Sequence, residues 1–103
     1  MSRPVVFTPE AQKDLLDLYD YIADRSSPAR ALGYINRIEK ACMSLKTLPE
    51  RGTRRDDLRA GLRVIGFERR VSIAFRVSSD SVAILRILYG GRNVELAFGD
   101  EDN

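Results

Sequence analysis

The sequence predicts an α+β fold in the order β-α-α-β-β-β, in which a helical hairpin packs on one face of a small, mainly antiparallel sheet. Three observations support this prediction. Apolar residues recur at helical spacing between residues 10 and 48, and they alternate with a period of two beyond residue 61. The chain has 103 residues, the length of one domain, so we expect a single domain over residues 1–103.

A short strand and two helices account for the first half of the chain. Residues 4–7 form a β-forming apolar run; Thr8 is suited to cap a helix and Pro9 to open it. Ser27 and Pro28 repeat this pattern, so the two helices form an antiparallel hairpin whose apolar side must lie on another layer. The predicted buried positions are Leu15, Leu18, Tyr19 and Ile22 in the first helix and Ala31, Ile35, Ile38, Cys42 and Leu45 in the second.

Strands follow a polar connecting loop at residues 50–61. Residues 62–65 predict a short strand that breaks near Gly66. Residues 69–77 form a strand with one apolar side, made of Val71, Ile73, Phe75 and Val77. After a turn at residues 78–81, residues 82–89 form a second strand that is almost wholly apolar.

The absence of histidine and the single cysteine exclude several kinds of site. Catalytic triads, metal sites and acid–base chemistry that need histidine cannot occur. Cys42 alone cannot form an internal disulfide or a thiolate zinc site, and its place on an apolar helical side indicates a core residue. We expect no metal and no cofactor. Four acidic residues of the first helix are expected on a solvated side: Asp14, Asp17, Asp20 and Asp24.

Charge is unevenly distributed along the chain. The net charge is +2, but residues 25–92 hold fifteen Arg and Lys residues against six acidic ones. Such an excess favours an acidic partner, either nucleic acid or an acidic protein segment. No apolar run is long enough to span a membrane, and the start lacks the apolar core of a signal peptide. We therefore expect a cytoplasmic protein without membrane association.

The strand at residues 82–89 is apolar on both sides, although one helical hairpin can bury only one of them. An apolar second face flanked by arginines predicts a docking surface for another chain. The alternative is that residues 93–98 fold over this face. The residues expected to bind the partner are Arg70, Arg76, Val82, Ile84, Arg86 and Leu88.

Several short motifs, in order and over residues 5–98, resemble the ParE toxins of bacterial toxin–antitoxin modules, within the ParE/RelE superfamily. They are residues 7–11 (FTPEA) with Asp14 and Leu15, residues 48–52 (LPERG), 55–58 (RDDL), 61–63 (GLR), 73–77 (IAFRV) and 84–92 (ILRILYGGR). The resemblance implies a helical hairpin on a small sheet. It also implies a cognate antitoxin whose acidic, amphipathic C-terminal segment wraps the toxin in a hetero-oligomer, with DNA contacted only through the antitoxin.

The resemblance implies two possible activities. ParE-like toxins are thought to inhibit DNA gyrase, whereas RelE-like relatives cut messenger RNA on the ribosome. A nuclease must move protons, which arginine does not do near neutral pH, and without histidine the best nearby group is Tyr89. If the protein is a nuclease, the candidate residues are Arg63, Arg86 and Tyr89; a toxicity surface would hold Arg63, Tyr89 and Arg92. The alternative for Arg63, Arg76 and Arg86 is salt bridging within the fold or to the antitoxin, and for Tyr89 a ring at the strand end with its hydroxyl in water. We favour a non-enzymatic gyrase inhibitor, with a nuclease or a non-toxic interaction module as alternatives.

Overall fold

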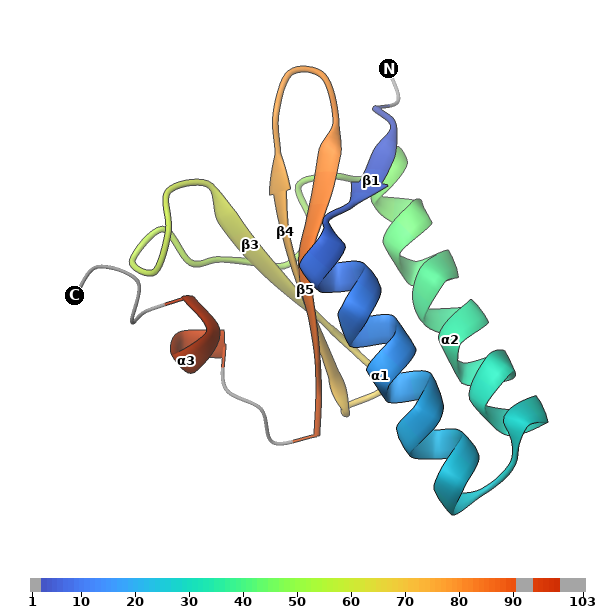
Figure 1. The fold of residues 1–103 in the computed structure, drawn as a ribbon. Helices are drawn as coiled ribbons and strands as arrows, with labels where there is room; N and C mark the ends of the chain where they lie inside the picture. The colour runs from blue at the N-terminus through green and yellow to red at the C-terminus, as the bar shows by residue number, and fades with distance from the viewer. Residues whose placement is uncertain (1–2, 91–93, 99–103) are drawn as a thin grey trace.

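Two long helices and a five-stranded sheet make up most of the computed structural model, which describes residues 3–90 and 94–98 (Figure 1). Helix α1 (Pro9–Arg25) begins where the Thr8 side chain accepts a hydrogen bond of 3.1 Å from the Ala11 N–H. Helix α2 (Pro28–Met43) begins in the same way at Ser27, and the 3₁₀ helix η1 (Ser44–Lys46) continues it. Both predicted N-caps are therefore confirmed.

The sheet has the strand order β1-β5-β4-β3-β2. Its strands are β1 (Val5–Phe7), β2 (Thr53–Arg54), β3 (Leu62–Phe67), β4 (Val71–Val77) and β5 (Val82–Tyr89). Strand β1 pairs with β5 in parallel, and the other pairs are antiparallel, so the predicted α+β class is confirmed. Three details differ from the prediction. The loop contains β2, and β3 continues through Gly66 to Phe67 because each of its residues pairs with β4. The strand predicted to begin at residue 69 begins at Val71, because residues 68–70 form the turn after β3.

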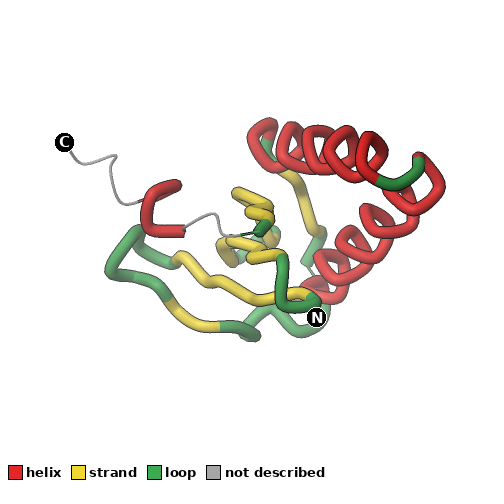
Figure 2. The backbone as a smooth tube through the Cα atoms, turned by 90° about the horizontal axis from the view of Figure 1, so that it is seen from below, coloured by secondary structure: helices red, strands yellow, loops and turns green. Residues whose placement is uncertain are grey.

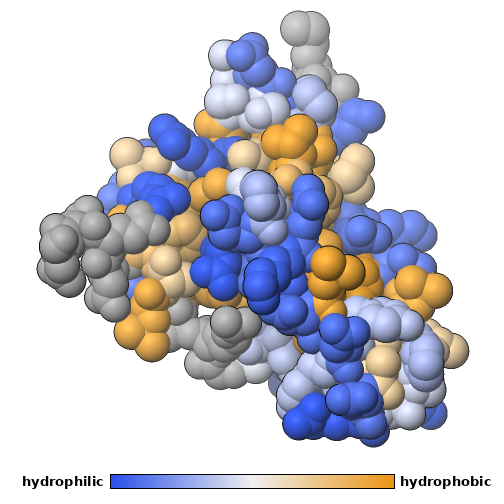
Figure 3. Space-filling view, viewed as in Figure 1, coloured by the Kyte–Doolittle hydropathy of each residue, from blue (hydrophilic) through white to orange (hydrophobic). Residues whose placement is uncertain are grey.

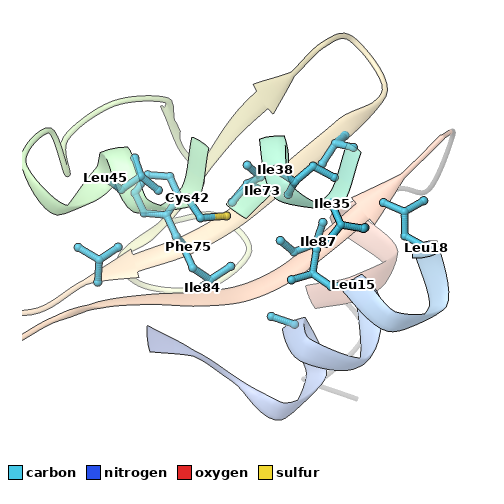
Figure 4. Packing of buried hydrophobic residues seen from close by; sticks show 13 residues of the cluster. Leu15, Leu18, Ile35, Ile38, Cys42, Leu45, Ile73, Phe75, Ile84 and Ile87 are labelled. Atoms are coloured by element: carbon cyan, nitrogen blue, oxygen red, sulfur yellow. The ribbon is translucent and has the colours of Figure 1, made fainter. Parts of the chain in front are cut away.

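The main core lies between the helical hairpin and one face of the sheet (Figure 2). Figure 4 shows side chains of α1, α2 and η1 packing against those of β4 and β5. The predicted helical positions Leu15, Leu18, Ile35, Ile38, Cys42 and Leu45 all lie in this cluster, together with Val71, Ile73 and Phe75 of β4. The helical spacing and the period-two alternation therefore identified the correct sides of these elements.

Strand β5 contains an irregularity that its apolar sequence did not reveal. Ala74 pairs with Arg86, whereas its neighbour Phe75 pairs with Ile84, so Leu85 is an extra residue in β5. This β-bulge puts Ile84 and Ile87 on the same face, although they are three residues apart. Leu85 instead joins the smaller cluster on the other face.

A second, smaller cluster lies on the face of the sheet away from the hairpin, where Leu62 and Ala74 pack with Phe98. Phe98 belongs to the short helix α3 (Val94–Phe98), which Figure 2 shows on the opposite side of the sheet from α1 and α2. The alternative that the tail folds over this face is therefore correct for Val94–Phe98. Asn93, which the same prediction included, lies outside the described residues.

Candidate functional site

The bulge of β5 is held to helix α1 by a nearly buried ion pair. Asp14 is 7% exposed, and its carboxylate accepts hydrogen bonds from Nε of Arg86 at 2.8 Å and from Nη2 at 3.1 Å. It also accepts one from the backbone N–H of Ile87 at 2.8 Å. The hydrogen bond with Asp14 raises the pKa of Arg86, so the guanidinium stays charged. The prediction that Asp14 lies on a solvated side of its helix is therefore wrong.

Helical spacing could have identified this position. Residues 11, 14, 15 and 18 lie on one side of a helix, and Ala11, Leu15 and Leu18 are all buried. Asp14 therefore belongs to the buried side. A buried carboxylate needs partners, and the chain supplies a guanidinium and a backbone N–H to meet that need.

Three residues expected on an open docking face lie in the interior. Val82 and Ile84 have no exposed surface and belong to the core under the hairpin, and Leu88 is 3% exposed. The expectation that they form an accessible surface is therefore wrong. Val82 and Ile84 pair with Val77 and Phe75, which face the hairpin, and the β-bulge at Leu85 then puts Ile87 rather than Arg86 on that face. The guanidinium of Arg86 is bound to Asp14, and its side chain is 24% exposed.

The other predicted arginines lie apart from one another. Arg76 is exposed on the second face of the sheet, beside Gly61, and Arg70 is exposed at the turn between β3 and β4. Arg63 is partly buried and donates from Nη1 to the carbonyl of Glu50 at 3.0 Å. Arg92 lies outside the described residues.

Tyr89, at the end of β5, belongs to a group of aromatic rings. Its ring centroid lies 5.8 Å from that of Tyr21 on α1 and 6.2 Å from that of Tyr34 on α2. Tyr34 in turn contacts Phe67 of β3, with the centroids 6.2 Å apart. Tyr89 therefore connects both helices to the sheet at the end of the molecule where the α1–α2 and β3–β4 turns lie (Figure 1).

At this end lies an open cavity of about 470 Å³, which we call the arginine–tyrosine cavity. It is lined by Arg30, Tyr34 and Arg37 of α2, Glu68 and Arg70 of the β3–β4 turn, Tyr89 of β5, and Ile22, Ser26 and Gly33. Glu68 accepts hydrogen bonds from Arg37 at 3.1 and 3.2 Å. Residues 30, 34 and 37 recur at helical spacing, a signal that could have identified this wall of the cavity.

The hydroxyl of Tyr34 is buried and has no hydrogen-bond partner among the residues that the structure describes. Burial is the main cause that raises the pKa of Tyr34, followed by the proximity of Tyr89. The phenol is therefore a neutral donor at neutral pH. A buried polar group without a partner is rare in folded proteins, so this one calls for an explanation.

A second surface feature is the groove between α1 and α2 on the outside of the hairpin. It carries the exposed side chains of Leu16 and Leu32, which are 67% and 54% exposed. The space-filling view shows hydrophobic residues on the surface over these helices (Figure 3). Large exposed apolar side chains in a groove are typical of contact surfaces.

The candidate nuclease residues do not face one another. Arg86 is bound to Asp14, Arg63 to the carbonyl of Glu50, and Tyr89 lies against two other tyrosines. Over residues 3–90 and 94–98, no group of three acidic or cysteine side chains could hold a metal ion. Nor does any helix of this part of the chain have the length and apolar character needed to cross a membrane.

Comparison with known proteins agrees with this architecture. Residues 5–94 match the family model described as the ParE toxin of the type II toxin–antitoxin system parDE. Toxin ParE3 of Caulobacter vibrioides is 30% identical over 95 residues, which cover 92% of this chain and 94% of the relative.

Two solved structures share the fold. One is described as the chromosomal ParDE TA system from P. aeruginosa, with a TM-score of 0.76, 28% identity, and coverage of 86% of this chain and 97% of the other. The other is the RelBE2 toxin–antitoxin complex of Mycobacterium tuberculosis, with a TM-score of 0.62, 21% identity, and coverage of 86% and 99%. The family match and the ParE3 relative together show that this chain belongs to the ParE toxin family of type II toxin–antitoxin systems.

Proposed function

We propose that this chain acts as the toxin of a type II pair by inhibiting DNA gyrase without catalysing a reaction, and that a cognate antitoxin neutralises it. Membership of the ParE family supports the general role. A partner is supported by the relatives whose structures are described as toxin–antitoxin systems or complexes.

The proposal of a non-enzymatic mechanism is supported mainly by the positions of the candidate nuclease residues, which do not face one another. Cleavage of RNA without a metal needs a base, an acid and a cationic group around one phosphate. Here the Asp14 carboxylate holds Arg86, and Tyr89 packs among other rings. No imidazole exists in the chain to transfer protons. Binding to a target protein needs no such arrangement.

The experiment is to induce the chain without an antitoxin and to assay the purified protein on two targets. We expect a DNA-damage response in cells and loss of supercoiling by gyrase in vitro. Cleavage of messenger RNA on ribosomes with normal supercoiling would show a nuclease instead. Unchanged growth on induction would show a non-toxic interaction module and would contradict the proposal.

For the antitoxin, we propose a binding surface that includes the exposed Arg70 and Arg76. Both guanidinium groups are exposed and suited to an acidic segment. Val82, Ile84 and Leu88 can take part only if the segment displaces the residues that now cover them, because they are buried in the free chain.

The test of this surface is Arg76→Glu, which replaces an attractive charge with a repulsive one against an acidic segment. We expect weaker antitoxin binding, measured by calorimetry. Lys13→Glu makes a similar change on the exposed side of α1 and serves as the matched control. An affinity unchanged within about threefold, roughly 0.6 kcal/mol, would remove Arg76 from the interface. Arg86→Glu is unsuitable, since it would place a second carboxylate beside Asp14.

A further inference from the structure

The arginine–tyrosine cavity has an excess of positive charge that the described part of the chain does not neutralise. Three guanidinium groups and one carboxylate line it, and that carboxylate, Glu68, is bound to Arg37. Arg30 and Arg70 form no ion pair with any described residue. The guanidinium groups of Arg30 and Arg70 therefore line the same cavity, beside the α1–α2 and β3–β4 turns.

Gly33 lies in the middle of α2 and lines the same cavity. Glycine is a poorer helix former than alanine, but without a Cβ atom it allows a ligand to approach the helix backbone closely. A Cβ atom at Gly33 would meet nothing within 4 Å in the free chain. The helix backbone at Gly33 therefore faces open space, from which a ligand could approach it closely.

The cavity suits an anion of more than one charge that is attached to a flat group. A phosphate monoester carries nearly two negative charges near neutral pH, which match Arg30 and Arg70, while a carboxylate carries one. The rings of Tyr34 and Tyr89 line the cavity, and, apart from the adjacent residues of α2, no described atom lies within 4 Å of the position that a Cβ atom would take at Gly33. A volume of about 470 Å³ lies within the usual range for small-molecule sites.

We propose that the arginine–tyrosine cavity binds a phosphate monoester of about nucleotide size, with Arg30 and Arg70 holding the phosphate and the planar group lying over Gly33. In this proposal the hydroxyl of Tyr34, which lines the cavity and has no partner among the described residues, is a further donor to the ligand. This site shares Arg70 with the proposed antitoxin surface. It does not depend on the proposed action on gyrase, and its failure in the test below would leave that action unaffected.

The test is isothermal titration of the whole chain with adenosine monophosphate, with adenosine and inorganic phosphate as the comparison ligands. We expect adenosine monophosphate to bind and each comparison ligand to bind at least tenfold more weakly. Arg70→Gln should weaken binding of the nucleotide by about tenfold, because guanidinium–phosphate contacts are charge-assisted. Lys46→Gln removes a positive charge from an exposed position outside the cavity and should leave the affinity unchanged.

Gly33→Ala is the most informative variant, because it is expected to change the affinity for the nucleotide without lowering the stability of the fold. The added methyl group should weaken nucleotide binding by about tenfold while the melting temperature of the free chain stays the same or rises. Wild-type affinity in Gly33→Ala would overturn the proposal. So would inorganic phosphate binding as tightly as the nucleotide, or an acidic peptide binding in the cavity when the nucleotide does not.

Discussion

The carboxylate of Asp14 accepts hydrogen bonds from two nitrogens of Arg86 and one of Ile87, and so joins α1 to the bulge of β5. Removing one partner of a nearly buried ion pair leaves the other without compensation, at a cost of about 3–5 kcal/mol. We expect Asp14→Ala to lower the free energy of unfolding by about this amount. Asp14→Asn should cost less, since its amide oxygen can still accept from Ile87.

Chemical denaturation of the single and double variants would check this prediction. Asp14→Ala combined with Arg86→Met should cost less than the sum of the two changes, since each alone leaves a group unpaired. The matched control lies on the same helix: Lys13 and Asp17 form an exposed ion pair at 2.8 Å, with side chains 75% and 58% exposed. Breaking that pair should cost less than about 1 kcal/mol. Additive costs for Asp14 and Arg86 would contradict the coupling.

At the scale of elements, the short helix α3 covers the second face of the sheet mainly through one side chain. Phe98 is 4% exposed and packs on Leu62 and Ala74, with the Arg59 guanidinium 4.9 Å from its ring centroid. We expect Phe98→Ala to lower the free energy of unfolding by about 3 kcal/mol. Leu96→Ala alters a side chain of the same helix that is 70% exposed. It should change the free energy of unfolding by no more than about 0.5 kcal/mol.

Thermal or urea unfolding of the two variants gives the comparison. Equal effects would show that α3 stabilises the fold through its backbone rather than through Phe98. If neither change lowers stability, α3 does not shield the second face in solution.

Strand β4 and strand β5 show what the sequence could and could not predict at this scale. In β4 the polar and apolar residues alternate, so the buried side could be predicted, and Val71, Ile73 and Phe75 are in the core as expected. In β5 nearly every residue is apolar, so the pattern contains no information on which side is buried. The bulge at Leu85 then changes the side, and it depends on pairing with β4 rather than on local sequence.

At the scale of the whole molecule, the rate at which the Cys42 thiol is modified measures how often the core opens. This thiol is fully buried between the hairpin and the sheet, and burial raises its pKa to about 12. Burial therefore disfavours the thiolate, which is the form that reacts. We expect a disulfide reagent at pH 8 to modify the native chain only as fast as the core opens, and the denatured chain at once.

The variant Leu45→Ala provides the control for this measurement. Leu45 has no exposed surface and lies in the same cluster, so the cavity left by the change should cost about 2–5 kcal/mol. Modification of Cys42 should then become at least tenfold faster. Rapid modification in the unaltered chain would mean that the thiol is accessible without opening of the core.

Strands β1 and β5, which are far apart in the sequence, pair in the sheet. Val5 of β1 pairs with Val82 of β5, and the Thr8 hydroxyl donates to the carbonyl of Leu85, 77 residues later, at 3.0 Å. During translation, the first strand and both helices must therefore leave the ribosome long before the strand on which they pack. A polypeptide released early lacks that strand and cannot complete the sheet. The sheet of this protein is therefore complete only after residues 82–89 have been synthesised.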